Sequence, residues 1–193
     1  MNDGIIKFEC DWLKAKPLEL NLVKELNRWR EKMYCLELIG AYPSGIGYGN
    51  ISVRFKGDQF IITGSETGRL KSLTPAHYTL VTSVDIDRNK LSCNGPIKAS
   101  SESLSHAACY FADKDIRAVI HVHSKKIWHE LLNKAMTTGK DATYGTPEMA
   151  YEITRLIKNN PFKNLIIMAG HEEGIISYGR SLKGAADEIL KYV

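Results

Sequence analysis

Two histidines separated by one residue form the most informative chemical pattern in the sequence. His121 and His123 follow Ala118-Val-Ile120, an apolar run that predicts a buried strand. Alternate residues of a strand point to one face, so the two imidazoles share a face with their Cα atoms about 7 Å apart. Neutral imidazole is the usual ligand of zinc, and a catalytic zinc site needs three protein ligands and one open position. The pair could therefore chelate one metal ion, but the pattern by itself is unspecific; the alternative is one buried histidine with a backbone partner and one exposed histidine.

A third ligand has to come from another part of the chain. His171 lies in Met168-Ala-Gly-His-Glu-Glu-Gly174, between two predicted strands, where a glycine-flanked loop can bring it back toward the sheet. The other histidines of the chain are His77, His106 and His129. Its position makes His171 the first candidate for the third ligand; the alternative is that His171 is an ordinary histidine in a surface turn.

A predicted helix start provides groups that suit an anion and a proton transfer. Ser100 and Ser101 supply hydroxyls, and the first turn of the helix supplies unpaired N–H groups. Glu102 follows them and would lie near a bound phosphate ester. Glu102 also has two structural alternatives that need no ligand. Its carboxylate can interact favourably with the helix dipole, or it can pair with His106 four residues later. The segments 47–50 and 63–68 are rich in small residues and N–H groups, as phosphate loops are, although ordinary turns share that composition.

The elements that must position these residues can be read from hydrophobic periodicity and from turn residues. Helices are predicted over 17–39, 101–112, 125–132, 146–158 and 181–192. Strands are predicted over 51–55, 59–63, 78–84, 90–93, 116–122, 165–168 and 174–178. Hairpins dominate the first half, which predicts an α/β protein of the α+β type with a largely antiparallel sheet covered by helices.

Length and composition limit the classes of protein. The 193 residues, 44% hydrophobic with a net charge of +4, suit a single domain over 1–193, with 1–16 as a loosely ordered lead-in. We see no signal peptide and no membrane span. The charge is spread, which argues against nucleic acid but permits phosphate esters. Four cysteines without a CxxC pair favour free thiols and a cytoplasmic location.

Six ordered segments together resemble the class II aldolase/adducin family, which includes fuculose-phosphate aldolases and ribulose-phosphate 4-epimerases. They are Gly49-Asn-Ile-Ser-Val-Arg54, Phe60-Ile-Ile-Thr63 with Thr67-Gly68, Ala99-Ser-Ser-Glu102, Ala118-Val-Ile-His-Val-His123, Thr143-Tyr-Gly-Thr146 and Gly170-His-Glu-Glu-Gly174. The resemblance covers about residues 25 to 190. It implies a three-layer fold with a central, largely antiparallel sheet flanked by helices, and a homotetramer with sites near subunit interfaces.

The resemblance also implies roles for individual residues. His121, His123 and His171 would bind Zn²⁺, although such a site also accepts Mn²⁺, Co²⁺ or Fe²⁺. Glu102 would be the catalytic acid/base, and Tyr144 would stand where the aldolases place an aromatic residue from the neighbouring subunit. The substrate phosphate would be held by Asn50, Thr67, Gly68, Ser100 and Ser101.

The predicted function is a metal-dependent aldehyde-lyase that cleaves a small phosphorylated ketose through a metal-stabilised enediolate. A sugar-phosphate 4-epimerase, dehydratase or decarboxylase using the same site is the first alternative, and a non-catalytic adducin-like assembly domain is the second. Two features depart from the aldolases. No tyrosine lies between His123 and Tyr144, where they carry a proton donor, and Glu66 adds negative charge next to the predicted phosphate site.

Overall fold

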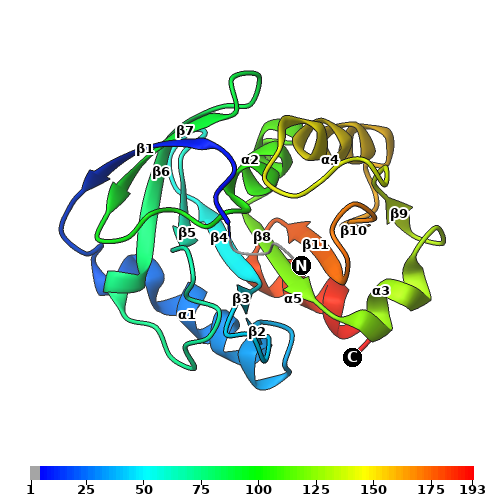
Figure 1. Cartoon of the computed structure of the whole chain (residues 1–193), viewed down its shortest axis with the longest axis horizontal. Helices are drawn as coiled ribbons and strands as arrows, with labels where there is room; N and C mark the ends of the chain where they lie inside the picture. The colour runs from blue at the N-terminus through cyan, green and yellow to red at the C-terminus, as the bar shows by residue number, and fades with distance from the viewer. Residues whose placement is uncertain (1–4) are drawn as a thin grey trace.

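A mixed sheet runs through the whole protein, which a computed structural model describes over residues 5–193 (Figure 1). Its strands in that range are β1 (Glu9–Lys14), β4 (Asn50–Arg54), β5 (Phe60–Thr63), β6 (Tyr78–Asp85), β7 (Lys90–Gly95), β8 (Ala118–His123), β9 (Met136–Thr137), β10 (Leu165–Ile167) and β11 (Gly174–Gly179). The strand order is β1-β7-β6-β5-β4-β8-β11-β10-β9, and β2 (Gly40–Ala41) pairs separately with β3 (Gly47–Tyr48). Neighbouring strands are antiparallel except at the two edges, which confirms the predicted fold class.

Helices cover both faces of this sheet and make three layers. The helices are α1 (Leu20–Cys35), α2 (Ser103–Ala112), α3 (Lys125–Leu131), α4 (Pro147–Asn159) and α5 (Leu182–Leu190), with a 3₁₀ turn at Pro75–His77. Figure 1 shows α2 and α4 on one side of the sheet and α1 and α5 on the other. Within the described residues, no helix is long and apolar enough to cross a membrane.

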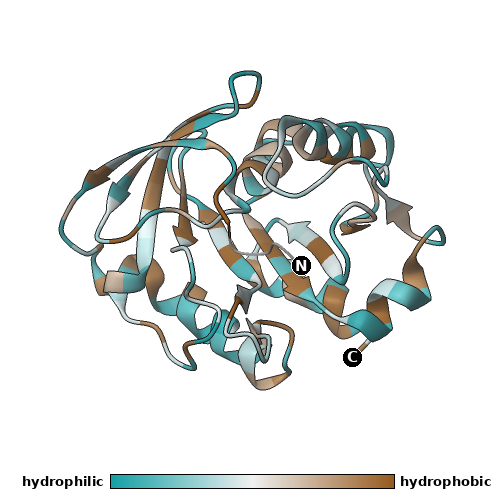
Figure 2. Cartoon of the chain, in the orientation of Figure 1, coloured by the Kyte–Doolittle hydropathy of each residue, from teal (hydrophilic) through white to brown (hydrophobic). Residues whose placement is uncertain are grey.

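Strand alternation divides the apolar side chains between two cores. On β5, Phe60 and Ile62 pack in the core that contains Leu104 of α2, whereas Ile61 packs in the core that contains Leu26 of α1. Helices α1, α4 and α5 turn their apolar stripes toward these cores and leave polar faces outside (Figure 2), whereas α2 is buried on all sides from Ser103 to Tyr110. Both faces of the central strands are therefore buried, which explains why β8 is apolar until it reaches its histidines.

The predicted lead-in is wrong where it meets the sheet. Residues 9–14 form β1, which pairs in parallel with β7 at the sheet edge. Trp12 Nε1 donates to the Gly95 carbonyl over 2.9 Å, and Lys90 Nζ lies 2.9 Å from carboxylates of both Glu9 and Asp11. The strand was missed because charged residues alternate with Cys10 and Trp12, so a half-buried edge strand has no apolar run. Residues 1–4 of the predicted lead-in lie outside the described range.

The predicted bounds of two helices also need correction. The first helix spans Leu20–Cys35 rather than 17–39, because Glu37 adopts a left-handed φ of 58° and turns Leu38 into the core. The second helix spans Ser103–Ala112 rather than 101–112; Glu102 occupies its N-cap position, and Ser103 Oγ donates to the Ser100 carbonyl over 2.7 Å. Ser100 and Ser101 thus remain in the turn before the helix.

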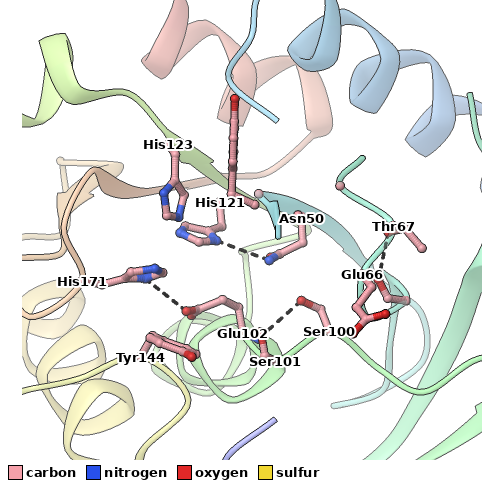
Figure 3. Close-up of a pocket in the computed structure, with 15 residues that line it drawn as sticks. Asn50, Glu66, Thr67, Ser100, Ser101, Glu102, His121, His123, Tyr144 and His171 are labelled. Atoms are coloured by element: carbon pink, nitrogen blue, oxygen red, sulfur yellow. Dashed lines mark hydrogen bonds and ion pairs between the residues drawn. The ribbon is translucent and has the colours of Figure 1, made fainter. Parts of the chain in front are cut away.

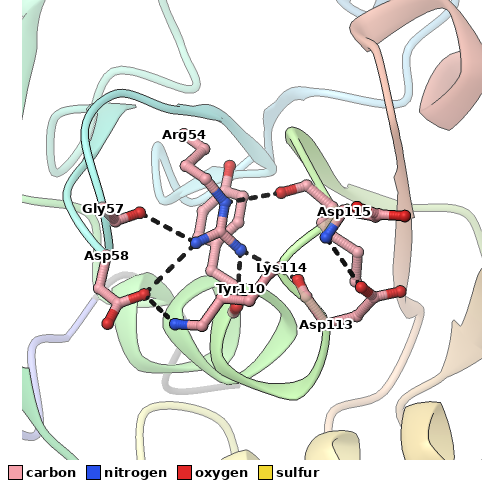
Figure 4. A network of polar contacts seen from close by, with 8 residues as sticks. Arg54, Gly57, Asp58, Tyr110, Asp113, Lys114 and Asp115 are labelled. Atoms are coloured by element: carbon pink, nitrogen blue, oxygen red, sulfur yellow. Dashed lines mark hydrogen bonds and ion pairs between the residues drawn. The ribbon is translucent and has the colours of Figure 1, made fainter.

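Arg54 has a structural position at the end of β4. Its guanidinium donates to the carbonyls of Ile116 (2.8 Å), Tyr110 (2.6 Å) and Gly57 (3.0 Å), which ties β4 to the turn between α2 and β8 (Figure 4). Its side chain is only 3% exposed, so these bonds satisfy a charge that is costly to bury alone. The arginine of the family-like GNxSxR segment therefore holds the strands that carry the site.

Candidate metal centre and adjoining pocket

The centre begins with the last residues of β8. His121 pairs with Asn50 on β4, and His123 pairs with Gly174 on β11, so both histidines are fixed in the middle of the sheet. Their side chains lie on the α2 face, with ring centroids 4.9 Å apart. The one-face geometry expected from their spacing is present.

His171 comes from the loop between β10 and β11. Its backbone N–H donates to the Met168 carbonyl, and its carbonyl accepts from Gly174, so the loop closes tightly. The His171 ring centroid lies 5.1 Å from that of His121 and 4.7 Å from that of His123. The ligand nitrogens of the three residues all lie within 4.8 Å of one another, and each residue is at most 5% exposed.

The other candidate histidines lie elsewhere among the described residues. His106 Nδ1 lies 2.6 Å from Ser52 Oγ, whose other contact is the Tyr110 hydroxyl, and His77 Nδ1 accepts from the Thr74 N–H. His129 is exposed on α3. Of the four histidines that the sequence left open, His171 is the one that joins the pair on β8.

The donor set fits a divalent metal ion. Burial, with smaller contributions from His123 and His171, lowers the pKa of His121 well below its usual range, so this imidazole is neutral and can offer a lone pair. Its Nε2 is buried and has no hydrogen-bond partner in the described part of the chain, and the same is true of Asn50 Oδ1. Asn50 Nδ2 lies 3.3 Å from His121 Nδ1, so a half-turn of the amide would let Oδ1 accept from Nδ1–H and leave the Nε2 lone pair for a metal.

Glu102 reaches the same centre from the start of α2. Its Oε1 lies 3.2 Å from His171 Nδ1, and its Oε2 accepts a hydrogen bond of 2.7 Å from Ser105 Oγ. The side chain is 2% exposed. A carboxyl group held this deeply beside three imidazoles is positioned to accept or donate a proton inside the pocket (Figure 3).

The rest of the pocket wall is made of loops. Asn50, Thr67, Gly68, Ser100 and Ser101 all line it, as the sequence predicts. Thr67 Oγ1 donates to the Gly64 carbonyl over 2.8 Å. A Cβ added at Gly68 would lie 2.6 Å from the Gly40 carbonyl oxygen, so only glycine fits there.

Two further residues shape this pocket. Glu66 lines it beside Thr67 and is exposed, with a left-handed φ of 61° (Figure 3). Tyr144 lines the pocket of its own chain, with its ring centroid 4.8 Å from that of His171 and Lys7 Nζ 3.7 Å above its ring. The structure therefore brings every residue of the predicted site to one pocket.

Sequence reasoning missed several contacts of this site. Tyr42 reaches His123 from the glycine-rich loop before β3, Ser105 holds Glu102, and Arg30 donates to the carbonyls of Thr67 and Gly68 over 3.0 and 2.8 Å. Ser105 follows Glu102 by three residues, a helical spacing that indicates contact. Arg30 falls among the apolar positions of α1, which marks it as buried. Nothing in the sequence connects Tyr42 with a histidine 81 residues away.

The family model of the class II aldolase and adducin N-terminal domain matches residues 43–192. The chain belongs to this family. All the residues of the centre fall within the matched range. A comparison with curated proteins finds no match.

Solved structures of this family share the fold. An L-fuculose 1-phosphate aldolase is 20% identical, with a TM-score of 0.70, covering 91% of this chain and 82% of that one. A sugar-phosphate aldolase from Thermotoga maritima is 14% identical, with a TM-score of 0.69 and coverage of 89% and 90%. YgbL from Escherichia coli, a candidate aldolase, epimerase or decarboxylase, is 19% identical, with a TM-score of 0.67 and coverage of 89% and 84%. At these identities the likeness shows the fold, and the activity has to be argued from the site.

Proposed function

We propose that this protein is a divalent-metal-dependent lyase that cleaves a small phosphorylated ketose by retro-aldol chemistry. The observation that carries the proposal is the meeting of three buried imidazoles with the buried carboxyl group of Glu102 in one pocket. Two structural neighbours are named as sugar-phosphate aldolases, which agrees with this chemistry.

His121, His123 and His171 would hold the ion, for which we propose zinc because neutral imidazole suits it. When bound, a divalent ion supplies Lewis acidity for the negative charge that develops on oxygen during carbon–carbon bond cleavage. Three protein ligands leave a coordination position open for substrate. Mn²⁺, Co²⁺ and Fe²⁺ also suit this donor set.

Glu102 is the proposed acid/base. The Ser105 hydroxyl holds one of its oxygens, so the other oxygen, beside His171, is the one turned to the centre. Moving a proton at carbon through a positioned carboxyl group contributes on the order of 10²–10⁴-fold to the rate. Tyr144, whose ring lies against His171, is a candidate second proton donor or a wall for the substrate.

The substrate phosphate is proposed to bind at Asn50, Thr67, Gly68, Ser100 and Ser101. These residues lie in the same pocket as the histidines, so a short ketose can contact both groups. Binding energy from such a remote, non-reacting group positions the bond that breaks. A single domain over 1–193, a homotetramer with sites near its interfaces and a cytoplasmic location remain proposals from the resemblance and the sequence.

Metal analysis followed by a substrate screen tests this function. Protein purified without a histidine tag is expected to hold about one divalent ion per chain and to release an aldehyde from at least one phosphorylated ketose. Product analysis separates aldehyde release from epimer, dehydrated or decarboxylated products. Failure to bind any divalent ion after reconstitution would contradict the proposal and favour a non-catalytic assembly domain.

A further inference from the structure

His123 has a second environment on the side away from the pocket. It lines the candidate metal pocket and also a surface hollow that contains Tyr42 and Glu173. In this hollow, the Tyr42 hydroxyl lies 2.7 Å from His123 Nδ1 and 3.3 Å from Glu173 Oε2. A carboxylate, a phenol and an imidazole therefore form one chain of contacts that ends at a proposed metal ligand.

Only one placement of protons satisfies both contacts. A carboxylate oxygen can only accept, so the single Tyr42 proton must point to Glu173. The Tyr42 oxygen then accepts from His123, which places the imidazole proton on Nδ1 and the lone pair on Nε2. The contacts outside the pocket thus select the tautomer that a metal site requires.

The backbone holds both partners in place. The Tyr42 N–H donates to the Ile46 carbonyl and its own carbonyl accepts from Gly45, so the tyrosine starts a closed turn. The Glu173 carbonyl accepts from the N–H of Ser124, the residue after His123. Glu173 keeps a left-handed φ of 66°, unusual for a residue with a side chain, and it is two residues from His171. The same short loop therefore presents one proposed ligand and supports another.

We propose that Tyr42 and Glu173 are positioning residues that fix the tautomer and orientation of His123 for metal binding. This inference rests on the metal site of the proposed function. Glu102 lines the metal pocket, whereas Tyr42 and Glu173 are not among its lining residues. Tyr42 and Glu173 would therefore affect metal binding through His123. Partners of this kind typically change metal affinity by 10- to 100-fold when they are removed.

The experiment measures metal affinity directly. Untagged full-length protein is stripped with a chelator and titrated with Co²⁺ by visible absorption, and Zn²⁺ affinity is then measured by competition with a chromophoric chelator. Tyr42→Phe is expected to weaken Zn²⁺ binding by roughly 10- to 100-fold and to alter the Co²⁺ spectrum. Glu173→Gln is expected to weaken it less, and the double variant to resemble Tyr42→Phe, because Glu173 acts through the phenol.

Matched variants separate positioning from general stability. Tyr48→Phe removes a neighbouring hydroxyl that bonds the Glu37 carbonyl, and Glu172→Gln neutralises the exposed carboxylate beside Glu173. Both are expected to keep wild-type affinity and the wild-type Co²⁺ spectrum. Thermal unfolding of the metal-free proteins shows whether Tyr42→Phe is folded, and Glu173→Gln tests the same chain of contacts if it is not.

The outcomes distinguish this inference from the function on which it rests. Wild-type affinity and an unchanged spectrum in both Tyr42→Phe and Glu173→Gln would overturn the positioning roles while the metal site stands. Equal losses in the test and control variants would also overturn them. A wild-type protein that binds neither Co²⁺ nor Zn²⁺ would overturn both proposals. Tight metal binding without lyase activity would remove the proposed reaction alone.

Discussion

The two ends of the pocket are built from different kinds of structure. At the metal end, His121 and His123 lie on a central strand and Glu102 starts a helix, and all three side chains are at most 4% exposed. At the anion end, the wall consists of turns around Thr67 and Ser100, with an exposed carboxylate from Glu66 among them. Regular elements therefore carry most of the metal end, with His171 as its loop residue, whereas turns carry most of the anion end, with Asn50 of β4 as its strand residue.

This difference reflects what each ligand requires. A metal ion needs neutral imidazoles in a fixed geometry, and burial in a sheet supplies both. An anion needs N–H and O–H donors, which turns present without a buried charge. Loops also change more readily than a central strand does. We therefore propose that the metal end carries the catalytic chemistry and that the anion end determines which substrate this chain binds.

Removal of a proposed metal ligand should have the largest effect. His121→Ala and His123→Ala are each expected to weaken metal binding by more than about 100-fold, since loss of outer contacts alone costs 10- to 100-fold. Activity should disappear with the metal. Elemental analysis and chelator competition measure the loss, and His129→Ala, in an exposed position on α3, is the control. Retention of one ion per chain in both variants would mean that the metal lies elsewhere.

Glu102→Gln should separate metal binding from proton transfer at the same end. The amide keeps the shape of the side chain but cannot act as an acid or base, so turnover should fall by about 10²–10⁴-fold while metal content is unchanged. Steady-state kinetics and metal analysis on the same sample make the comparison. Glu148→Gln, an exposed carboxylate in the first turn of α4, is the matched control. Full turnover in Glu102→Gln would assign the proton to another group.

A third prediction concerns the buried imidazole beside the metal end. Burial lowers the pKa of His106 from 6.5 to about 3, so below pH 6.5 the unfolded chain binds a proton that the folded chain does not. Folding stability should therefore fall as the pH falls, by about 2 kcal/mol between pH 8 and pH 5 from this residue alone. Urea unfolding of the metal-free protein at the two pH values measures it. His106→Gln should reduce the decrease; an identical decrease in this variant would assign the pH dependence to other groups.

The metal end could be predicted from sequence to a large extent. Alternation places His121 and His123 on one face of any strand, and a glycine-flanked loop before the next strand favours His171. The same rules do not predict contacts between residues that lie far apart in the chain and share no sequence periodicity. Tyr42 meets His123 only because the segment before β2 lies against the end of β8, where the His123 N–H donates to the Leu38 carbonyl. Lys7 meets Tyr144 only because β1 pairs at the sheet edge. Long-range pairing decides such contacts, and no local pattern contains it.

A substitution at the anion end should have the smallest effect, but it gives the most direct test of the difference between the two ends. Glu66 carries a negative charge next to the proposed phosphate site, so Glu66→Gln should strengthen binding of a phosphorylated ketose. Because Glu66 is exposed, solvent and salt screen its charge, and the expected gain is only about two- to fivefold at low salt. The Michaelis constant measured at low and high salt tests this, with Glu172→Gln as an exposed control. A gain that vanishes at high salt would place the phosphate beside Thr67. An unchanged constant at low salt would mean that the anionic group of the substrate lies away from this loop, and the division of the pocket into a metal end and an anion end would then have to be redrawn.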